Sequence, residues 1–455
     1  MNPDTLAING GAPSVRTKYR ESWRQIRSTD LLPILAAARR DISTLAKGEG
    51  EIAEFEQRFA RLTGSSHALA MNSGTAALHS AYFAVGVRPG TEVIVPGYTF
   101  FATAAPILQC GGRPVFCDID PETLLADPGA AERCITPFTR AICVVHLWGN
   151  PAPMDRFVEI ARRHKLALIE DCSHAHGALY CGRPVGSWAD IGCFSLQGPK
   201  AVSGGEAGIA VTDDPVLFDR MLVLGHYGRL KKGQAANTFD TDYLSLGVKY
   251  RPHLYAIQLA LGSLSRLDEL NRRRQRNYEI LCNELTSCRA VEPIKTTPEG
   301  VRGGFLEFIL RYTPEYAGNW KRKAFVEALD AEGVPIGVER YARIGDRKRL
   351  LHESPIFSAS DGSQFGGVVP SAASHPVSTP ELPGVLSVAD RLLTLPAFTR
   401  VPEKFIRECA LAIRKVAECA AMTGNASQPA QLKPTPMKPK EQEDGMAVAE
   451  SRRGA

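Results

Sequence analysis

The stretch Leu166-Ala-Leu-Ile-Glu-Asp-Cys-Ser-His-Ala-His-Gly177 joins a short apolar run to a turn that is rich in polar side chains. Similar apolar runs occur at Glu92–Pro96 and Arg140–Val145, and helix-like periodic stretches separate them. Short apolar runs that alternate with helical patterns are typical of buried parallel strands. The alternation between residues 51 and 214 therefore predicts an α/β domain with a largely parallel sheet. In such sheets ligands gather at the carboxyl ends of the strands, and we expect the chemistry there.

The pattern is shorter and more mixed in the C-terminal part of the chain. After a helix expected from Leu264 to Leu281, there is a strand candidate at Phe305–Leu310 and helix candidates at 321–329 and 402–419. These elements predict a second, smaller α+β domain. We therefore divide the chain into an N-terminal arm (1–30), a large α/β domain (31–265), a small C-terminal domain (266–423) and a tail (424–455).

Two segments differ in composition from these domains. Residues 354–378 are rich in Ser, Gly and Pro, which predicts a long surface loop whose role the sequence does not indicate. Beyond about Thr423 the chain is rich in Pro, Lys, Glu and Gln and has almost no large apolar residue. Such a segment buries too little surface to offset its ordering entropy, so we expect a disordered tail.

The overall composition is that of a globular protein and does not indicate a nucleic-acid partner. The 455 residues are 44% hydrophobic and include 54 basic and 49 acidic side chains, which gives a net charge of +5. So small an excess implies no nucleic-acid surface unless the positive charges cluster. One cluster, Arg272, Arg273, Arg274 and Arg276, lies in the expected helix, and we interpret it as a solvated helix face.

Cysteine usage and hydropathy predict a cytoplasmic protein. The eleven cysteines form no Cys-x-x-Cys pair, and reduced thiols fit this pattern better than disulfides do. The sequence has no apolar run of about 18 residues, and its N-terminus lacks a basic region followed by an apolar one. We therefore expect neither membrane insertion nor export.

Three elements carry the candidate chemistry, and the first is Asn72-Ser-Gly-Thr-Ala-Ala-Leu78. It lies between the apolar run His67–Met71 and a stretch of helical pattern. Ser73 suits a helix N-cap, Gly74 allows close backbone approach, and free amides at a helix start attract an anion such as phosphate. A helix cap without a ligand would have the same pattern.

The second element is the polar turn that begins at Asp171. A carboxylate at a strand end can keep a pyridine nitrogen protonated, which makes the ring an electron sink. His174 and His176 suggest a metal site, but they lack the helical His-Glu-x-x-His spacing and an evident third ligand. We therefore predict no metal, and for each histidine both a structural and a catalytic role stay open.

The third element is Phe194-Ser-Leu-Gln-Gly-Pro-Lys-Ala-Val-Ser-Gly-Gly-Glu-Ala-Gly208, which contains Lys200. Pro199 and the glycine-rich turn disfavour a helix here, and the small residues leave room for a bulky group. A lysine amine can hold an aldehyde cofactor as a Schiff base, and once released it can act as a base. An exposed loop lysine would also fit a single Gly-Pro-Lys sequence.

In this order, the three elements resemble the DegT/StrS-type family of sugar aminotransferases, a branch of fold type I. The resemblance covers about Asn9 to Thr423 and includes Asn9-Gly-Gly-Ala-Pro13 and Val95-Pro-Gly-Tyr-Thr-Phe-Phe-Ala-Thr103. It implies a large domain with a mostly parallel central sheet, a smaller C-terminal α+β domain and pyridoxal 5'-phosphate as the cofactor. It also implies a homodimer in which the two chains share each active site.

The resemblance implies a role for each matching residue. Lys200 would hold the cofactor, Asp171 would pair with its ring nitrogen and Phe100 would stack on its face. The expected catalytic residues are Lys200, Asp171 and His174. The expected cofactor-binding residues are Ser73, Gly74, Thr75, Phe100, Asp171, Ser195, Gln197, Lys200 and Lys249.

The sequence departs from the family pattern at two places within the expected site. Glu206 is followed by Ala207, where the family commonly has glycine, and this costs only backbone freedom. The family's Gly-x-Asn-x-Arg, whose Asn usually reaches the partner subunit's cofactor phosphate, is here Gly247-Val-Lys-Tyr-Arg251. Lys249 could bind that phosphate as a cation instead.

The implied reaction moves an amino group from glutamate or glutamine to a keto-sugar, a nucleotide-linked keto-sugar or a cyclitol ketone. No residue decides among these acceptors. A sugar dehydratase of the same fold is an alternative, but those relatives carry histidine where this chain has Lys200. A cofactor-binding regulatory protein without catalysis is the other alternative.

Overall fold

The computed structural model describes residues 5–18, 27–39, 47–230, 246–343, 349–358 and 381–424. Most of the predicted loop 354–378 and all of the predicted tail after Gly424 lie outside these ranges. The part of loop 354–378 within them contains the short helix α11 (Pro355–Ser358). The domain limits drawn from the sequence stay a prediction.

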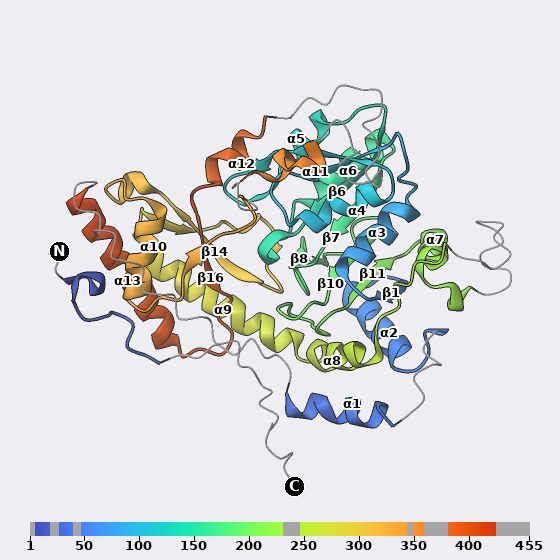
Figure 1. Cartoon of the computed structure of the whole chain (residues 1–455), viewed down its shortest axis with the longest axis horizontal. Helices are drawn as coiled ribbons and strands as arrows, with labels where there is room; N and C mark the ends of the chain where they lie inside the picture. Colours follow the sequence, from blue (N-terminus) through green and yellow to red (C-terminus); the bar gives the residue numbers. More distant parts are fainter. Residues whose placement is uncertain are drawn as a thin grey trace, which may run out of the picture.

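A seven-stranded sheet with the order β1-β11-β10-β7-β6-β2-β3 forms the centre of the larger part of the molecule (Figure 1). Neighbouring strands from β10 to β3 run parallel, whereas β11 pairs antiparallel with both of its neighbours. The mostly parallel sheet predicted from the sequence is therefore confirmed. Its strands are β1 (His67–Met71), β2 (Glu92–Pro96), β3 (Arg113–Cys117), β6 (Thr139–Val145), β7 (Ala167–Asp171), β10 (Ile191–Ser195) and β11 (Gly208–Thr212).

Helices cover this sheet, and every residue of β2 and β11 is buried. Burial on both faces explains why the strands are continuous apolar runs rather than alternating ones. Helix α3 packs on β10 and β11, and α6 packs on β6 and β7. The helices of this part are α2 (Glu51–Thr63), α3 (Gly74–Ala84), α4 (Ala105–Gln109), α5 (Pro128–Arg133), α6 (Met154–His164), α7 (Pro215–Gly225) and α8 (Leu254–Leu264).

The smaller part is an antiparallel sheet with the order β12-β14-β16-β15, which shares a core with helices α9, α10 and α13 (Figure 1). Its core includes the buried Phe308, Trp320 and Phe398. The predicted smaller α+β domain is therefore confirmed. Its elements are α9 (Leu267–Leu285), β12 (Val291–Pro293), β14 (Glu307–Tyr312), α10 (Arg322–Ala331), β15 (Gly337–Val338), β16 (Leu392–Pro396) and α13 (Glu403–Thr423).

The helix expected from Leu264 to Leu281 has different bounds. Helix α8 ends at Leu264, and α9 begins at Leu267 and continues to Leu285. Arg266 between them has a non-helical backbone, and its guanidinium donates hydrogen bonds of 2.7 and 2.9 Å to the carboxylate of Asp30. The break therefore accompanies a tertiary ion pair that no local pattern indicates.

The prediction that the arginine cluster forms a solvated helix face is wrong for Arg274. This side chain is 3% exposed. Its guanidinium donates hydrogen bonds to Thr399 Oγ1 at 2.8 Å and to the Phe305 carbonyl at 3.0 Å. Arg274 therefore ties α9 to neighbouring loops, whereas Arg276 forms an exposed ion pair with Glu403.

The N-terminal arm lies against the smaller part of the molecule (Figure 1). The buried carboxylate of Glu332 accepts hydrogen bonds from the amides of Ala7 and Ser14, each at 2.9 Å. Helix α1 (Leu31–Ala37) follows the arm and packs on α8. None of the helices in the described ranges has the length and apolar character needed to cross a membrane. The remaining elements are β4 (Ile119–Asp120), β5 (Leu125–Ala126), β8 (Leu179–Tyr180), β9 (Arg183–Pro184), β13 (Gly300–Val301) and α12 (Pro383–Val388).

Candidate active site

A cavity of about 560 Å³ lies where the carboxyl ends of β7 and β10 meet the first turn of α3. Every site residue expected from the sequence lines this cavity except Lys249. Segments far apart in the chain thus meet at the strand ends, as expected for a parallel sheet. The expected residues that line it are Ser73, Gly74, Thr75, Phe100, Asp171, His174, Ser195, Gln197 and Lys200.

The start of α3 forms an anion-binding end of the cavity. Ser73 is the N-cap, and its hydroxyl accepts a hydrogen bond from the Ala76 amide at 3.0 Å. The amides of Gly74 and Thr75 have no acceptor within the helix, because they belong to its first turn. A Cβ on Gly74 would lie 2.6 Å from the Ser195 Cβ, so only glycine lets α3 begin this close to β10. Free amides and the helix dipole suit a phosphate group here.

Asp171 is a buried carboxylate in a fixed orientation at the end of β7. Its Oδ2 accepts a hydrogen bond from the Thr103 hydroxyl at 2.8 Å, and its Oδ1 accepts one from the Ser173 amide at 3.1 Å. The Thr103 hydroxyl in turn accepts from the Thr99 hydroxyl at 2.9 Å. Sequence reasoning missed both threonines, although they lie in the stretch Val95–Thr103 that carries part of the family resemblance.

Lys200 lies in the turn after β10 with 7% of its surface exposed. Its backbone amide donates a 2.9 Å hydrogen bond to the Gln197 carbonyl, which closes the turn. Burial lowers the pKa of Lys200 to about 8, although the charge of Asp171 opposes this shift. A much larger fraction of this amine is therefore uncharged near neutral pH than for a solvent-exposed lysine, which makes it a usable nucleophile and base.

His174 is a neutral imidazole in the wall of the cavity. Burial lowers its pKa well below the ordinary histidine value. Its Nδ1 accepts a 3.3 Å hydrogen bond from the Trp148 amide, so the ring proton is on Nε2. Trp148 itself has a left-handed backbone (φ 56°), a strained conformation for a bulky residue that is often found at functional sites.

The smaller part of the molecule contributes Arg340 and Tyr341 to the cavity wall. Both follow β15, and the buried carboxylate of Glu339 accepts a 2.6 Å hydrogen bond from the Tyr341 amide. The Tyr341 ring stacks on Trp148 with 4.9 Å between ring centroids, and Phe100 lies 5.5 Å away. Sequence reasoning missed Arg340 and Tyr341, because no motif or periodicity marks them.

Two candidate residues lie away from the cavity. His176 is completely buried against Phe194, with 5.6 Å between ring centroids, and burial lowers its pKa to about 3. This environment favours the structural role for His176. Lys249 is exposed, and its carbonyl accepts a 3.3 Å hydrogen bond from the Asn72 side chain.

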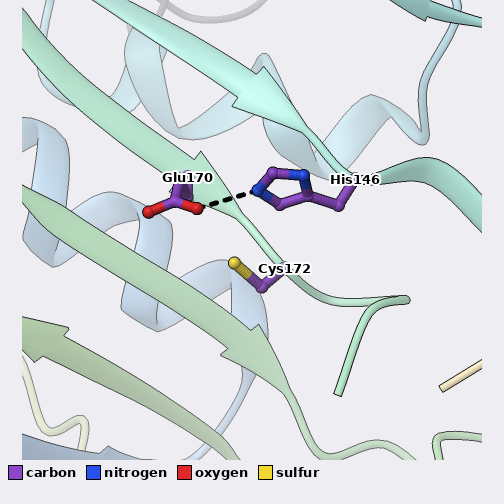
Figure 2. A group of neighbouring side chains, drawn as sticks. All are labelled: His146, Glu170 and Cys172. Carbon is purple, nitrogen blue, oxygen red and sulfur yellow. Dashed lines mark hydrogen bonds and ion pairs between the residues drawn. The ribbon is translucent and has the colours of Figure 1, made fainter. Parts of the chain in front are cut away.

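Figure 2 shows His146, Glu170 and Cys172, whose polar atoms are close enough together to suggest a metal site. The His146 Nδ1 accepts a 2.9 Å hydrogen bond from the Ala152 amide, so its Nε2 carries the proton and donates to Glu170 at 2.9 Å. Burial raises the pKa of the Cys172 thiol well above its usual value, so this group is neutral. Hydrogen bonds between His146 and Glu170, and from neighbouring amides, therefore account for the closeness of these two side chains. The Glu170 carboxylate also accepts from the amides of Gly186, Trp188 and Ala189 at 2.8 to 3.0 Å.

A buried lysine and carboxylate beside an anion-binding helix start, at the ends of a mostly parallel sheet, define a fold type I pyridoxal-phosphate-dependent transferase. The chain belongs to the DegT/DnrJ/EryC1/StrS aminotransferase family, whose sequence profile matches residues 35–354. The family and the enzyme class predicted from the sequence are therefore confirmed.

Two similar proteins are named as L-glutamine-dependent aminotransferases of inososes. The chain is 37% identical over 376 residues to the L-glutamine:2-deoxy-scyllo-inosose aminotransferase of Streptomyces kanamyceticus, covering 80% of this chain and 85% of that protein. It is 32% identical over 379 residues to the L-glutamine:scyllo-inosose aminotransferase of Streptomyces griseus, covering 79% and 88%. The crystal structure of DesI with its TDP-sugar product matches with a TM-score of 0.74 and 29% identity, covering 92% of this chain and 98% of DesI.

Proposed function

We propose that this aminotransferase moves the amino group of L-glutamine to the ketone of a cyclitol, with pyridoxal phosphate held on Lys200. The observation that carries this proposal is a single cavity that contains the buried Lys200, the anchored Asp171 and the open first turn of α3. The donor and the acceptor class are supported by the relatives from Streptomyces, of which the chain covers most of the length.

The residues of the cavity fit pyridoxal phosphate. The amides of Gly74 and Thr75, with Ser195 and Gln197 beside them, would hold its phosphate. Asp171 would hold its ring nitrogen, and Phe100 would cover a face of the ring. The close approach of Gly74 to Ser195, which a side chain would prevent, supports a cradle that is shaped for a ligand.

When bound, pyridoxal phosphate supplies an electron sink for the negative charge that develops at the carbon bearing the amino group. Asp171, fixed by Thr103 and Ser173, would keep a proton on the ring nitrogen and so maintain that sink. The Lys200 amine would hold the cofactor and, when released by the donor, move the proton between carbon atoms. His174 would remain neutral and donate a hydrogen bond from Nε2.

Absorption spectroscopy tests this function directly. We expect the purified protein with pyridoxal phosphate to show a visible band that L-glutamine converts into a near-ultraviolet band, and that a cyclitol ketone then restores. Lys200→Ala should lack the visible band, whereas Lys323→Ala, which removes an exposed lysine on α10, should behave as wild type. A wild-type band that L-glutamine does not discharge would contradict the proposal.

A nucleotide-linked keto-sugar is the second candidate acceptor, and the match to DesI with its TDP-sugar product favours it. The glutamine-treated protein distinguishes the two candidates. A cyclitol ketone and a TDP-linked keto-sugar are offered separately, and return of the visible band is followed over time. Faster return with the TDP-linked sugar would replace the cyclitol in the proposed function.

We also propose that the chain is a homodimer with shared active sites. Phe101 is 49% exposed and Leu246 is 62% exposed, and both are large apolar residues that a second chain would cover. Lys249 is exposed and lies outside the cavity of its own chain, which fits a role at the partner's phosphate site. Mixing inactive Lys200→Ala chains with Lys249→Ala chains should regain activity, because one hybrid site then has both lysines. No regain, with dimers present in sedimentation, would contradict sharing through Lys249.

A further inference from the structure

Arg340 lines the cavity, but none of the proposed cofactor contacts involves its side chain. Among the described residues that line the cavity, Arg340 and Lys200 are the cationic side chains. The Arg340 guanidinium is close enough to Lys200 and His174 for its charge to affect the pKa of each. Burial lowers the pKa of Lys200 and of His174, and the positive charge of Arg340 lowers both further.

The guanidinium is paired, but much of it stays available. Its Nη1 donates hydrogen bonds to both carboxylate oxygens of Glu307, at 2.8 and 3.0 Å. Thr394 donates a 2.9 Å hydrogen bond to Glu307 and fixes that carboxylate. The Arg340 side chain is 52% exposed, whereas Glu307 is 13% exposed. A guanidinium has five N–H donors, and those of Nε and Nη2 take no part in the Glu307 pair. This edge can bind a second anion beside the Tyr341 ring, whose centroid lies 5.0 Å from the guanidinium carbon.

The backbone that carries Arg340 is firmly held. Glu339 accepts hydrogen bonds from the amides of Tyr341 at 2.6 Å and Ala342 at 3.0 Å, which closes a turn around Arg340. The Tyr341 ring is stacked on Trp148 of the larger part. A side chain on such a turn is presented to the cavity with a defined position, which ligand recognition requires.

We propose that Arg340 binds the α-carboxylate of the amino donor and that Glu307 is the counter-ion of Arg340 between donors. This inference rests on the proposed function, in which L-glutamine and an uncharged cyclitol occupy the same cavity in turn. A guanidinium binds a carboxylate through two parallel hydrogen bonds. Glu307 keeps the arginine charge compensated when the uncharged cyclitol occupies the cavity.

Binding of glutaramate, which is L-glutamine without its α-amino group, tests the carboxylate contact without any reaction. The holoenzyme is titrated while tryptophan fluorescence is followed, because Trp148 stacks on Tyr341 beside the cavity. We expect Arg340→Gln to weaken binding by roughly 10- to 100-fold, the usual effect of losing a hydrogen bond to a charged group. Arg343→Gln is the matched control, because Arg343 pairs with Asp390 and does not line the cavity.

Glu307→Gln tests the role of the counter-ion. We expect this variant to bind glutaramate several-fold more tightly, because the guanidinium no longer shares its charge with a resident carboxylate. The same variant should have a raised KM for the uncharged acceptor with kcat little changed. Weaker glutaramate binding in a Glu307→Gln protein with an unchanged melting temperature would contradict the counter-ion role.

The decarboxylated analogue of L-glutamine separates carboxylate recognition from general positioning. Conversion of the visible band by this amine should proceed equally in wild type and Arg340→Gln, whereas conversion by L-glutamine should be slowed only in the variant. Equal slowing with both amines would overturn the assignment. If L-glutamine does not discharge the wild-type protein, the proposed function fails, and the glutaramate titration still decides whether Arg340 binds a carboxylate.

Discussion

The floor of the cavity, formed by Gly74, Asp171 and Lys200, comes from the strand ends and α3 of the larger part, whereas its roof, formed by Arg340 and Tyr341, comes from the turn after β15. Each floor residue belongs to a motif that the sequence displays. The roof residues belong to none. The difference indicates that the residues proposed to hold the cofactor are marked by short local motifs, whereas Arg340 and Tyr341 join the cavity only through the packing of the turn after β15 against the larger part.

The largest expected effect concerns the floor. Lys200→Ala should reduce the rate of amino transfer by roughly 100- to 10,000-fold, because a positioned base contributes about two to four powers of ten. The measurement is kcat for glutamine-dependent amination, with the far-ultraviolet circular dichroism spectrum as the check on folding. A folded variant that retains a tenth or more of the wild-type rate would remove Lys200 from the proposed role.

Asp171 and Thr103 provide a graded test of the same floor. Asp171→Asn removes the charge at the ring nitrogen and should lower kcat by roughly 100-fold. Thr103→Val removes only the hydroxyl that donates to Oδ2 and should cost about 10-fold or less. Both rates are measured at saturating donor and acceptor. Equal losses in the two variants would mean that orientation of Asp171, rather than its charge, dominates.

The bounds of β1 and β2 could be predicted from the sequence, whereas the strand expected at Phe305–Leu310 is β14, which begins at Glu307 and ends at Tyr312. Strands β1 and β2 are apolar runs with turns at both ends, so the residues next to them in sequence determine where each strand begins and ends. The break between α8 and α9 accompanies the pairing of Arg266 with Asp30, a contact between distant segments. Local patterns contain no information about such pairs.

The same distinction applies to the site. The floor residues were predicted because a helix cap, a strand-end acid and a glycine-flanked lysine are local signals. Arg340 reaches the cavity only because the turn after β15 packs beside Trp148. A single arginine in a mixed segment has no neighbours in sequence that mark it as a residue of the cavity. The arginine cluster was misinterpreted for the converse reason, since Arg274 is buried by loops that lie far from it in the chain.

A smaller effect is expected from widening the close approach of Gly74 to Ser195 at the start of α3. Gly74→Ala places a Cβ 2.6 Å from the Ser195 Cβ, so α3 must shift and its first-turn amides move with it. We expect the affinity for pyridoxal phosphate to fall about 10-fold. Overpacking typically costs about 1 to 3 kcal/mol, and a small shift of α3 would relieve part of that cost. Equilibrium dialysis measures the affinity. Gly198→Ala is the control, because its Cβ would approach only the Gly205 carbonyl, at 4.0 Å, and unchanged affinity in Gly74→Ala would argue against a tight cradle.

The smallest expected effect is the influence of the charges of Arg340 and Glu307 on the pKa of Lys200. Burial lowers the pKa of Lys200 to about 8, with Asp171 and Glu307 opposing the shift and Arg340 reinforcing it. Only the neutral amine attacks an aldehyde, so the rate at which the apoprotein takes up pyridoxal phosphate should rise with pH through about 8 and then level off. Removing a positive neighbour stabilises the protonated lysine. Arg340→Gln should therefore move the midpoint to higher pH, and Glu307→Gln should move it to lower pH, by a few tenths of a unit each.

Stopped-flow recording of the visible band gives the midpoints, and Arg343→Gln should leave the midpoint in place. A shift in the same direction for both variants would show that the roof acts on Lys200 through packing and not through its charges.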